Sequence, residues 1–427
     1  MIPTRDNQSG MAQPITLFIS AGEASGEHYG ALLTAALKRC LTAGGHTARF
    51  FGMGGARMAA AGLETVVRSE DVAVMGLTEV VRHLPQIYRE YRKLKREIRI
   101  RRPAVAVLID SPEIHLRLAK EFHKFGIPVI YFVSPQLWAW KKHRIRLVQQ
   151  YVRRMLVIFP FEEAFYRQND VKADFVGHPL ADLPLPSISR EQFASENGLN
   201  PAKTWIGLLP GSRFKEIGAH LPKMLEAARE LDQSAIAAGQ PGCEFVLPLA
   251  PTLNPEQRLS ITHRVDRLGA GLTVRLTGDA RATLHHARAS VVASGTATVE
   301  AALIGNPFVA IYRVSAITYA IAKRLVKLDH VAMPNLIAGR RIVPELIQNE
   351  FTVDNIVQQM GRLLPDGSER QSMMIELEAV RNALKAQPAS SQSQGGSAME
   401  RVAEIVLEQL ETASSGKRIP AQTCIPM

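Results

Sequence analysis

Two acidic residues that follow predicted strands are the candidates for acid–base chemistry. Asp110 ends the apolar run AVAVLID, and the Ser-Pro that follows it keeps a helix from beginning at once. Glu23 lies in the loop AGEASGEHYG, which follows the apolar run ITLFIS. A carboxylate at the carboxyl end of a parallel strand can take a proton from a hydroxyl group or accept a hydrogen bond from a sugar. The alternative roles are local: Asp110 could cap the next helix, and the Glu23 loop could be a polar turn capped by Ser25 and Glu27.

Two loops in the second half of the chain have the features of a phosphate-binding site. One follows the apolar run WIGLL, and the other separates the apolar run 290–293 from a helical pattern. They consist of Gly211, Ser212 and Arg213, and of Ser294, Gly295 and Thr296. Small residues let a diphosphate approach the main chain, free N–H groups at a helix start attract an anion, and arginine donates a planar fork. Glu300, one turn into the helix, could accept hydrogen bonds from ribose hydroxyls. An ordinary strand-to-helix connection and a surface arginine are the structural alternatives.

The elements that must position these residues are predicted from short apolar runs that alternate with helical patterns. This alternation is typical of a parallel, doubly wound α/β sheet, in which ligands bind at the carboxyl ends of the strands. The runs predicted as strands are ITLFIS, HTARFFGMGG, AVAVLID, IPVIYFV and RRMLVIF in the first half, and WIGLL, CEFVLPLAP, LTVRLTG, ASVVASG and PFVAIYRV in the second.

Prolines cluster at 177–179 and 183–187, between these two groups of runs, and mark a domain boundary. We therefore predict two Rossmann-like domains that face each other across a cleft. The predicted segments are a flexible N-terminus at 1–13, a first domain at 14–183, a second domain at 184–360, C-terminal helices at 361–411 that pack back or are exchanged within a homodimer, and a flexible tail at 412–427.

Composition excludes several classes of protein. Of the 427 residues, 46% are hydrophobic and fall in short runs, so the chain is not disordered. The apolar run at 15–19 is too short for an export signal or a membrane span, and Met1 and Met11 are equally good starts of translation. Neither GxGxxG nor a P-loop is present. The three cysteines are far apart, and no histidine or cysteine spacing suits a metal site, so we expect cytosolic thiols and no metal cofactor.

A net charge of +11 favours an acidic partner, such as nucleic acid, an anionic membrane or a phosphorylated substrate. A helical apolar stripe at 74–87 leads into a basic segment at 89–102, and such a helix can lie on an anionic membrane. The alternative is that the stripe packs on its own sheet and the charges are solvated. The residues concerned are Val74, Leu77, Val81 and Leu84 in the stripe and Arg92, Lys93 and Arg96 in the basic segment. The segment 138–146, WAWKKHRIR, lacks the repeated aromatic residues of a single-strand nucleic-acid platform.

Several strings resemble, in order and spacing, the lipid-A-disaccharide synthase family. They are AGEASGEHYGA, VMGLTEVV, DSPE, SPQLWAW, GHPLAD, LPGSRFKEI, SGTATVEAAL, AKRLVKLDHVAMPNLIAGRRIVPELIQ and SAMERVAEIVLEQL. The resemblance covers about residues 14–411, and the longer strings are hard to match by chance.

The resemblance implies an inverting glycosyltransferase of the GT-B type. It would join UDP-2,3-diacylglucosamine to 2,3-diacylglucosamine 1-phosphate, giving the β-1,6-linked lipid A disaccharide and UDP, at the cytoplasmic face of the inner membrane of a Gram-negative bacterium. It implies essential roles for Asp110 and Glu23, a nucleotide-binding role for Arg213, and a UDP site that includes the 294–296 turn and Glu300. Asn335 would lie on the second-domain side of the cleft. No nucleic acid would be bound.

Two loops depart from the usual pattern of the family, GEASGD and DSPDFN or DAPDFN. Glu27, Glu113, Ile114 and His115 stand where Asp, Asp, Phe and Asn are usual, so contacts near the acceptor are expected to differ. Two other functions fit parts of the sequence. A soluble UDP-sugar enzyme such as a UDP-N-acetylglucosamine 2-epimerase would need the same phosphate loops without a lipid surface, and a basic nucleic-acid-binding protein would explain the charge without using Asp110.

Overall fold

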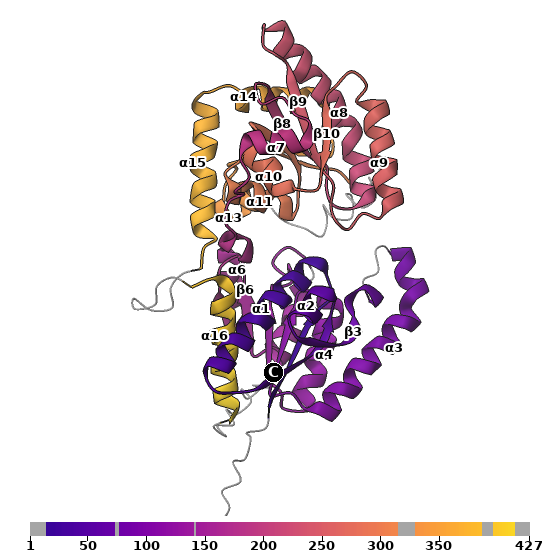
Figure 1. Cartoon of the computed structure of the whole chain (residues 1–427). Coiled ribbons are helices and arrows are strands. Elements are labelled where there is room, and N and C mark those ends of the chain that lie inside the picture. The colour runs from indigo at the N-terminus through magenta and orange to yellow at the C-terminus, as the bar shows by residue number, and fades with distance from the viewer. Residues whose placement is uncertain (1–13, 73–76, 141, 315–328, 387–395, 415–427) are drawn as a thin grey trace, which may run out of the picture. The chain divides into compact units, whose positions relative to one another are not determined.

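The computed structural model describes residues 14–72, 77–140, 142–314, 329–386 and 396–414. The chain divides into two compact units, which we call unit 1 (Met1–Pro179 and Ala386–Met427) and unit 2 (Leu180–Lys385). The expected C-terminal segment, 361–411, is divided between them. Each unit is built around one parallel sheet, as the alternating pattern predicts (Figure 1).

The sheet of unit 1 has seven parallel strands in the order β3-β2-β1-β4-β5-β6-β7. From β1 the chain runs outward to β2 and β3, and then returns across the sheet to β4 beside β1. The switch point, where the loops after neighbouring strands turn to opposite faces, is therefore between β1 and β4. The strands are β1 (Ile15–Ala21), β2 (Ala48–Gly54), β3 (Leu63–Arg68), β4 (Val105–Ile109), β5 (Val129–Phe132), β6 (Arg154–Val157) and β7 (Ala173–Phe175).

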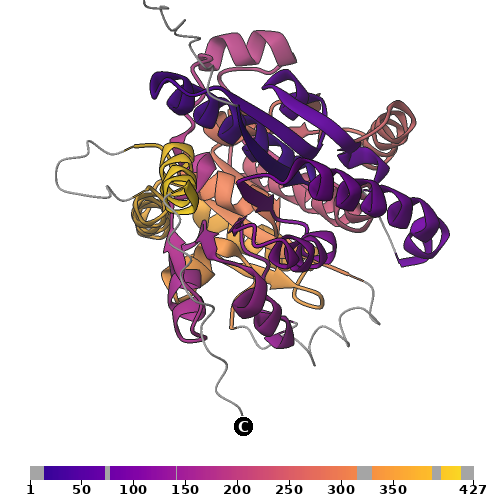
Figure 2. The same ribbon diagram turned by 90° about the horizontal axis from the view of Figure 1, so that it is seen from below.

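Helices cover both faces of this sheet, because the strand residues that point to one face and those that point to the other are both mainly apolar. Leu17, Ile19 and Ala21 of β1 pack against α1 (Ala24–Ala43) and α16 (Ala398–Ser414). Phe18, on the other face, belongs to a cluster with Leu94 of α3 (Leu77–Arg101) and with α4 (Pro112–Lys124). These layers can be followed in Figures 1 and 2. The remaining α-helices of this unit are α2 (Ala56–Ala60), α5 (Ile145–Tyr151) and α6 (Pro160–Arg167).

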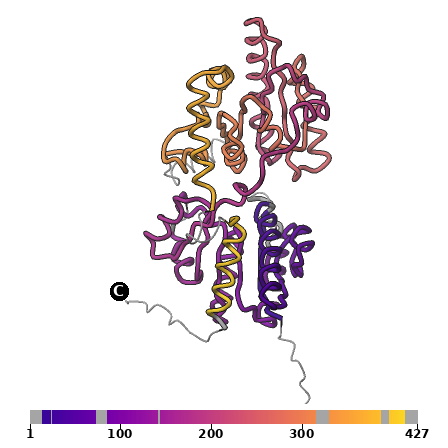
Figure 3. The backbone as a smooth tube through the Cα atoms, turned by 60° about the vertical axis from the view of Figure 1, so that its left-hand side comes forward, coloured from indigo at the N-terminus to yellow at the C-terminus, as the bar shows by residue number. Residues whose placement is uncertain are grey.

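The C-terminal helix α16 completes the core of unit 1, and Figure 3 shows it as a yellow tube beside the indigo N-terminal segments of the same unit. Val402, Ala403 and Val406 are fully buried in its interface with α1 and the sheet. Arg154 of β6 fixes it further, because its guanidinium contacts Asp174 at 2.6 Å and Glu408 of α16 at 2.8 Å.

The sheet of unit 2 has six parallel strands in the order β10-β9-β8-β11-β12-β13, so its switch point lies between β8 and β11. The strands are β8 (Thr204–Leu209), β9 (Cys243–Pro248), β10 (Val274–Thr277), β11 (Ala289–Ala293), β12 (Phe308–Tyr312) and β13 (Glu345–Ile347). The α-helices among its described residues are α7 (Arg190–Asn197), α8 (Phe214–Ala237), α9 (Pro255–Leu268), α10 (Ala280–His286), α11 (Thr296–Ile304), α13 (Met333–Ala338), α14 (Val353–Leu363) and α15 (Ser368–Ala383).

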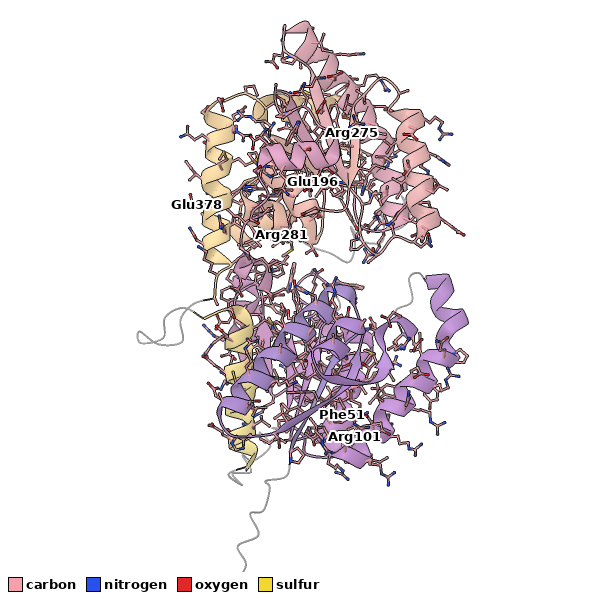
Figure 4. All side chains as sticks on the ribbon, in the orientation of Figure 1. Phe51, Arg101, Glu196, Arg275, Arg281 and Glu378 are labelled. Atoms are coloured by element: carbon pink, nitrogen blue, oxygen red, sulfur yellow. The ribbon has the colours of Figure 1, made fainter. Side chains whose placement is uncertain are left out.

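The basic segment lies on α3, and its apolar side packs on the sheet of unit 1. Leu94 and Ile98 are fully buried, whereas the exposed side carries Arg92, Lys93 and Arg96. The C-terminal end of α3 is anchored by Arg101, which lies over the ring of Phe51 at 4.8 Å and pairs with Glu64 at 2.6 Å (Figure 4).

The apolar stripe predicted before this segment is less fully described. Val74 lies outside the described residues, and for Leu77, Val81 and Leu84 the structure describes the helical backbone of α3 alone. The membrane-binding interpretation of the stripe therefore stays a prediction.

Candidate active site

Asp110 lies directly after β4, at the switch point of unit 1. Its φ is 53° and that of the next residue, Ser111, is 47°, so two successive residues adopt the left-handed conformation, which costs a non-glycine residue about 1–2 kcal/mol. A strained main chain of this kind is often found at functional sites. Hydrogen bonds hold it: the Asp110 N–H donates to Phe132 O at 3.0 Å, and the Asp110 carbonyl accepts from His115 Nδ1 at 2.7 Å and from Tyr131 Oη.

The carboxyl group of Asp110 is less acidic than that of an exposed aspartate. Its pKa is raised from an ordinary 3.8 to about 6, mainly by burial and in smaller part by the nearby Glu23 carboxylate. A hydrogen bond from the main-chain N–H of Ser111 opposes this rise. A carboxylate with such a pKa is a stronger base than an exposed aspartate. The two acidic residues predicted from the sequence are thus brought together.

Glu23 reaches this place because the loop after β1 packs against the loop after β4. A Cβ added to Gly22 would lie 2.6 Å from Ser111 Oγ, so a larger residue would displace the serine side chain or separate the two loops. Glu23 is exposed and is the residue before α1, but its side chain does not cap that helix. Glu27 caps a different helix, because its Oε1 accepts from the N–H of Arg57 in α2 at 2.8 Å. The carboxylate of Glu23 is therefore not used to cap α1.

The loop after β5 is held by a buried carboxyl group that sequence reasoning missed. Glu162 is 1% exposed, and its Oε1 accepts from Ser134 Oγ at 2.7 Å and from Trp138 Nε1 at 3.0 Å. Burial raises its pKa to about 7, although these hydrogen bonds oppose the rise. Val133, at the start of the loop, has a φ of 61°, which is rare for a β-branched residue. The position of Glu162 in the first turn after Pro160 was the available signal.

In unit 2, the loop after β8 places Gly211, Ser212 and Arg213 beside the end of β11. Gly211 has a φ of 120°, and a Cβ there would lie 2.8 Å from Glu216 Oε2, so this position requires glycine. Arg213 precedes α8, its side chain is 65% exposed, and its Nη1 donates to Glu216 Oε1 at 2.8 Å. The guanidinium is therefore held near the strand end and is accessible to an anion.

The predicted second loop, Ser294 to Thr296, leads into α11 at the same switch point. Gly295 and Thr296 are exposed, and no side chain in the described part of the protein caps the helix, so its first N–H groups are oriented as in an anion site. Both hydrogen-bond donors of Ser294 are used within the protein. Its N–H donates to Ile311 O at 2.8 Å, and its hydroxyl group donates to Val331 O at 3.1 Å. Only its oxygen lone pairs can serve a ligand.

Glu300 lies one turn into α11, as predicted. Burial raises its pKa, while the positive charge of Arg281 on α10 lowers it and Asp279 raises it. Arg281, labelled in Figure 4, donates from Nη2 to Pro184 O at 2.7 Å, and its buried Nη1 has no hydrogen-bond partner among the described residues. A partly buried carboxyl group with one cation nearby can accept hydrogen bonds from a vicinal diol.

Asn335 is fully buried, and its amide group is saturated by neighbouring residues. Oδ1 accepts from the N–H groups of Ile342 and Val343 at 2.7 and 2.9 Å, and Nδ2 donates to Val343 O and to Glu345 Oε1. These bonds join α13 to β13. Direct contact between Asn335 and a nucleotide sugar stays a prediction, and in this structure the residue organises its own loop.

His220 is a second residue that the sequence did not reveal. It lies on α8, is fully buried, and its Nδ1 donates to Pro210 O at 2.7 Å while its Nε2 accepts from the N–H of Arg313 at 3.1 Å. It thus joins the loop after β8 to the end of β12. Tyr312, the last residue of β12, lies close enough to Glu216 and Arg213 for their charges to affect its pKa, which burial raises.

No group of three or more histidine, cysteine, aspartate or glutamate side chains in the described ranges is arranged to hold a metal ion. No helix in the same ranges has the length and apolar character needed to cross a membrane.

The arrangement can support two operations at strand ends. Unit 1 offers a basic carboxylate with a second carboxylate beside it, which suits removal of a hydroxyl proton. Unit 2 offers an exposed guanidinium, a glycine-containing turn and an uncapped helix start, which suits binding of a diphosphate.

Solved structures with this fold include enzymes that act on nucleotide sugars. The crystal structure of UDP-GlcNAc 2-epimerase from Neisseria meningitidis bound to UDP-GlcNAc has a TM-score of 0.58 at 14% identity, covering 93% of this chain and 100% of that one. The glycosyltransferase of kitacinnamycin has a TM-score of 0.55 at 15% identity, with coverages of 93% and 100%. At such identities the likeness shows the fold alone, which is that of the GT-B glycosyltransferases.

Sequence relatives are much closer. The lipid-A-disaccharide synthase of Acidobacterium capsulatum is 56% identical over 418 residues, which are 96% of this chain and 100% of the relative. That of Koribacter versatilis is 49% identical over 396 residues, with coverages of 92% and 98%. The family model described as lipid-A-disaccharide synthetase matches residues 17–399. The chain therefore belongs to the lipid-A-disaccharide synthase family, a family of UDP-sugar-dependent glycosyltransferases.

Proposed function

We propose that this protein joins UDP-2,3-diacylglucosamine to the 6-hydroxyl of 2,3-diacylglucosamine 1-phosphate, with inversion at the anomeric carbon. The observation that carries the proposal is the pair of carboxyl groups at the switch point of unit 1, in a chain that belongs to this family. Asp110 combines a strained main chain, a raised pKa and an acidic neighbour in Glu23. Placing these two carboxylates close together does not stabilise the fold, because like charges repel each other.

In the proposed step, the acceptor oxygen attacks the anomeric carbon while the Asp110 carboxylate takes its proton. The bond between that carbon and the diphosphate oxygen breaks, and UDP leaves with the electron pair. A pKa of about 6 leaves the carboxyl group mostly ionised at neutral pH and basic enough to accept the proton. Glu23 assists by keeping the pKa of Asp110 raised.

The negative charge that develops on the leaving diphosphate is stabilised by unit 2. Arg213 supplies a guanidinium that is 65% exposed, and the N-terminal N–H groups of α11 supply oriented dipoles. We propose that these groups serve in place of a metal cofactor. We propose that the carboxylates of unit 1 act on the acceptor hydroxyl group and that the diphosphate loops of unit 2 act on the UDP-sugar donor.

The acyl chains of both substrates require access to a lipid surface, and we propose that the exposed side of α3 binds it. This side presents Arg92, Lys93 and Arg96, and next to them Tyr88 is 61% exposed. Cationic side chains near an anionic membrane contribute about 1 kcal/mol each. We expect the protein to float with anionic vesicles, salt to weaken this binding, and the combined replacements Arg92→Glu, Lys93→Glu and Arg96→Glu to abolish it. Binding that ignores both lipid charge and salt would exclude an electrostatic contribution.

The decisive test of the reaction is its product. The purified protein is incubated with UDP-2,3-diacylglucosamine and 2,3-diacylglucosamine 1-phosphate, and mass spectrometry and NMR identify the product. We expect the β-1,6 disaccharide 1-phosphate and one UDP per disaccharide. Conversion of unacylated UDP-N-acetylglucosamine to its 2-epimer, with no disaccharide formed, would overturn the proposal. Asp110→Ala should abolish turnover while leaving UDP affinity unchanged, because UDP contacts only unit 2 in this proposal.

A further inference from the structure

The main chain at Asp110 is in a left-handed conformation, which the acid–base role of its carboxyl group does not by itself explain. Asp110 and Ser111 both have left-handed φ values, 53° and 47°, and neither is glycine. The chain would leave this conformation unless other groups held it. Two of the groups that hold it, His115 and Tyr131, bond the Asp110 carbonyl and not its carboxyl group.

His115 is the most specific of these groups. It lies in the first turns of α4, is fully buried, and its Nδ1 is 2.7 Å from the Asp110 carbonyl oxygen. A carbonyl only accepts, so Nδ1 carries the proton and Nε2 is left as an acceptor. Ser20 of β1 lies 2.8 Å from Nε2 and donates its hydroxyl hydrogen to it. One imidazole ring therefore links the end of β4 to β1, the two strands that form the switch point.

Tyr131 completes the arrangement from β5. Its hydroxyl group donates to the same Asp110 carbonyl, and its ring contacts His115 edge to face, with centroids 6.3 Å apart. Burial lowers the pKa of His115 to about 4, so the ring stays neutral and keeps a single tautomer at the pH of any ordinary assay. The carbonyl is thus held by two donors from two different elements.

We propose that His115 is a positioning residue: it fixes the left-handed main chain of Asp110 and thereby the direction of the catalytic carboxyl group. The inference rests on the proposed function, because it assigns His115 a role through Asp110. His115 itself does not touch substrate. The alternative is an ordinary buried histidine that stabilises the core of unit 1 without affecting catalysis.

Two replacements separate these roles by geometry. An asparagine side chain places its amide nitrogen near the position of imidazole Nδ1, whereas a glutamine side chain reaches toward the position of Nε2. His115→Asn therefore keeps the donor to the Asp110 carbonyl and loses the acceptor for Ser20. His115→Gln keeps a partner for Ser20 and loses the donor to Asp110. His123→Gln, on the exposed side of the same helix, is the matched control.

The experiment measures kcat, KM and the pH dependence of kcat/KM for the disaccharide reaction. We expect His115→Gln to lower kcat by about tenfold or more, a loss that corresponds to about one buried hydrogen bond, with KM little changed. His115→Asn should recover most of the activity, and His123→Gln should match the wild type. The acidic limb of the profile, expected near pH 6 for the wild type, should move toward the ordinary pKa of an aspartate in His115→Gln. A purely structural role would lower the amount of folded enzyme without moving this limb.

Tyr131→Phe keeps the test decisive if His115→Gln does not fold, because it removes only the second donor to the same carbonyl. We expect it to lower kcat and to shift the acidic limb in the same direction. Wild-type kcat and an unshifted limb in both His115→Gln and Tyr131→Phe would overturn the inference. Asp110→Asn is measured in parallel: if it retains turnover, the proposed role of Asp110 fails, whereas inactivity of Asp110→Asn beside normal His115 and Tyr131 variants refutes only the positioning role.

Discussion

Replacing Asp110 by asparagine should stabilise unit 1 at neutral pH while it abolishes turnover. The folded state raises the pKa of Asp110, so folding favours its protonated form. The stability that this group contributes is fully present below its ordinary pKa of 3.8 and is lost as the pH rises through about 6. Asparagine resembles the protonated acid in shape and polarity, and it tolerates the left-handed conformation. Asp110→Asn should therefore keep the stability that the wild type loses.

The expected gain follows from the size of the pKa change. Raising a pKa from 3.8 to about 6 is equivalent to about 3 kcal/mol, which is an upper bound because the unfolded chain and local relaxation reduce it. The assay is urea-dependent hydrogen exchange, followed by mass spectrometry on peptides from β1 and β4, since it reports on unit 1 separately from unit 2. At pH 8 we expect the variant to be more stable by about 1–3 kcal/mol, and at pH 4 we expect the difference to disappear.

Asp174→Asn provides a control of opposite sign. Asp174 accepts two hydrogen bonds from Arg154, at 2.6 and 2.9 Å, so loss of its charge should destabilise unit 1 at pH 8. If Asp110→Asn is no more stable than the wild type at pH 8, or if its gain is the same at pH 4 and pH 8, then Asp110 is not a desolvated carboxylate and the reasoning is wrong.

Three other predictions concern the loops and the C-terminal helix. Arg213→Ala should weaken UDP binding by about 10- to 100-fold, the usual value of charged hydrogen bonds, and calorimetry showing unchanged affinity would remove Arg213 from the diphosphate site. Gly22→Ala should destabilise unit 1 by about 1–3 kcal/mol and lower kcat, because its Cβ would lie 2.6 Å from Ser111 Oγ; a variant with normal melting and turnover would contradict that close approach. Glu408→Gln should cost less than about 1 kcal/mol, since Glu408 is half exposed. Arg154→Met leaves the partly buried Asp174 carboxylate unpaired and should cost about 2–3 kcal/mol in urea titrations; equal costs would refute this difference.

The central strands of both sheets could be predicted from the sequence, but three edge strands could not. β1, β4, β8 and β11 are buried on both faces and therefore form continuous apolar runs. β3, β7 and β13 lie at the edges of their sheets. Their sequences, LETVVR, ADF and ELI, are short or mixed because one side has no neighbouring strand, and they give no apolar run to recognise.

The residues that lie at the switch points were predicted, but the groups that hold them were not. Asp110 and Arg213 follow apolar runs directly, so their position at a strand end can be deduced from local sequence. Glu162 and His115 act through partners in distant strands and loops, such as Ser134 and Ser20, and a single sequence gives no means of pairing them. Asn335 was likewise expected at the nucleotide sugar, and that role stays a prediction; the sequence did not reveal that its amide group bonds its own loop.

The same hydrogen-bonding arrangement occurs in both units, which suggests a common physical requirement. In unit 1, His115 donates to the carbonyl of Asp110 and accepts from Ser20; in unit 2, His220 donates to the carbonyl of Pro210 and accepts from the N–H of Arg313. A neutral imidazole can donate at one ring nitrogen and accept at the other across a fixed distance, and it has few rotatable bonds to order. It can therefore tie a loop after one strand to a second strand without adding charge to the site. By this argument, His220→Gln, which loses the donor to Pro210, should weaken UDP binding more than His220→Asn, which keeps it, and equal affinities for the two variants would show that His220 serves only the core.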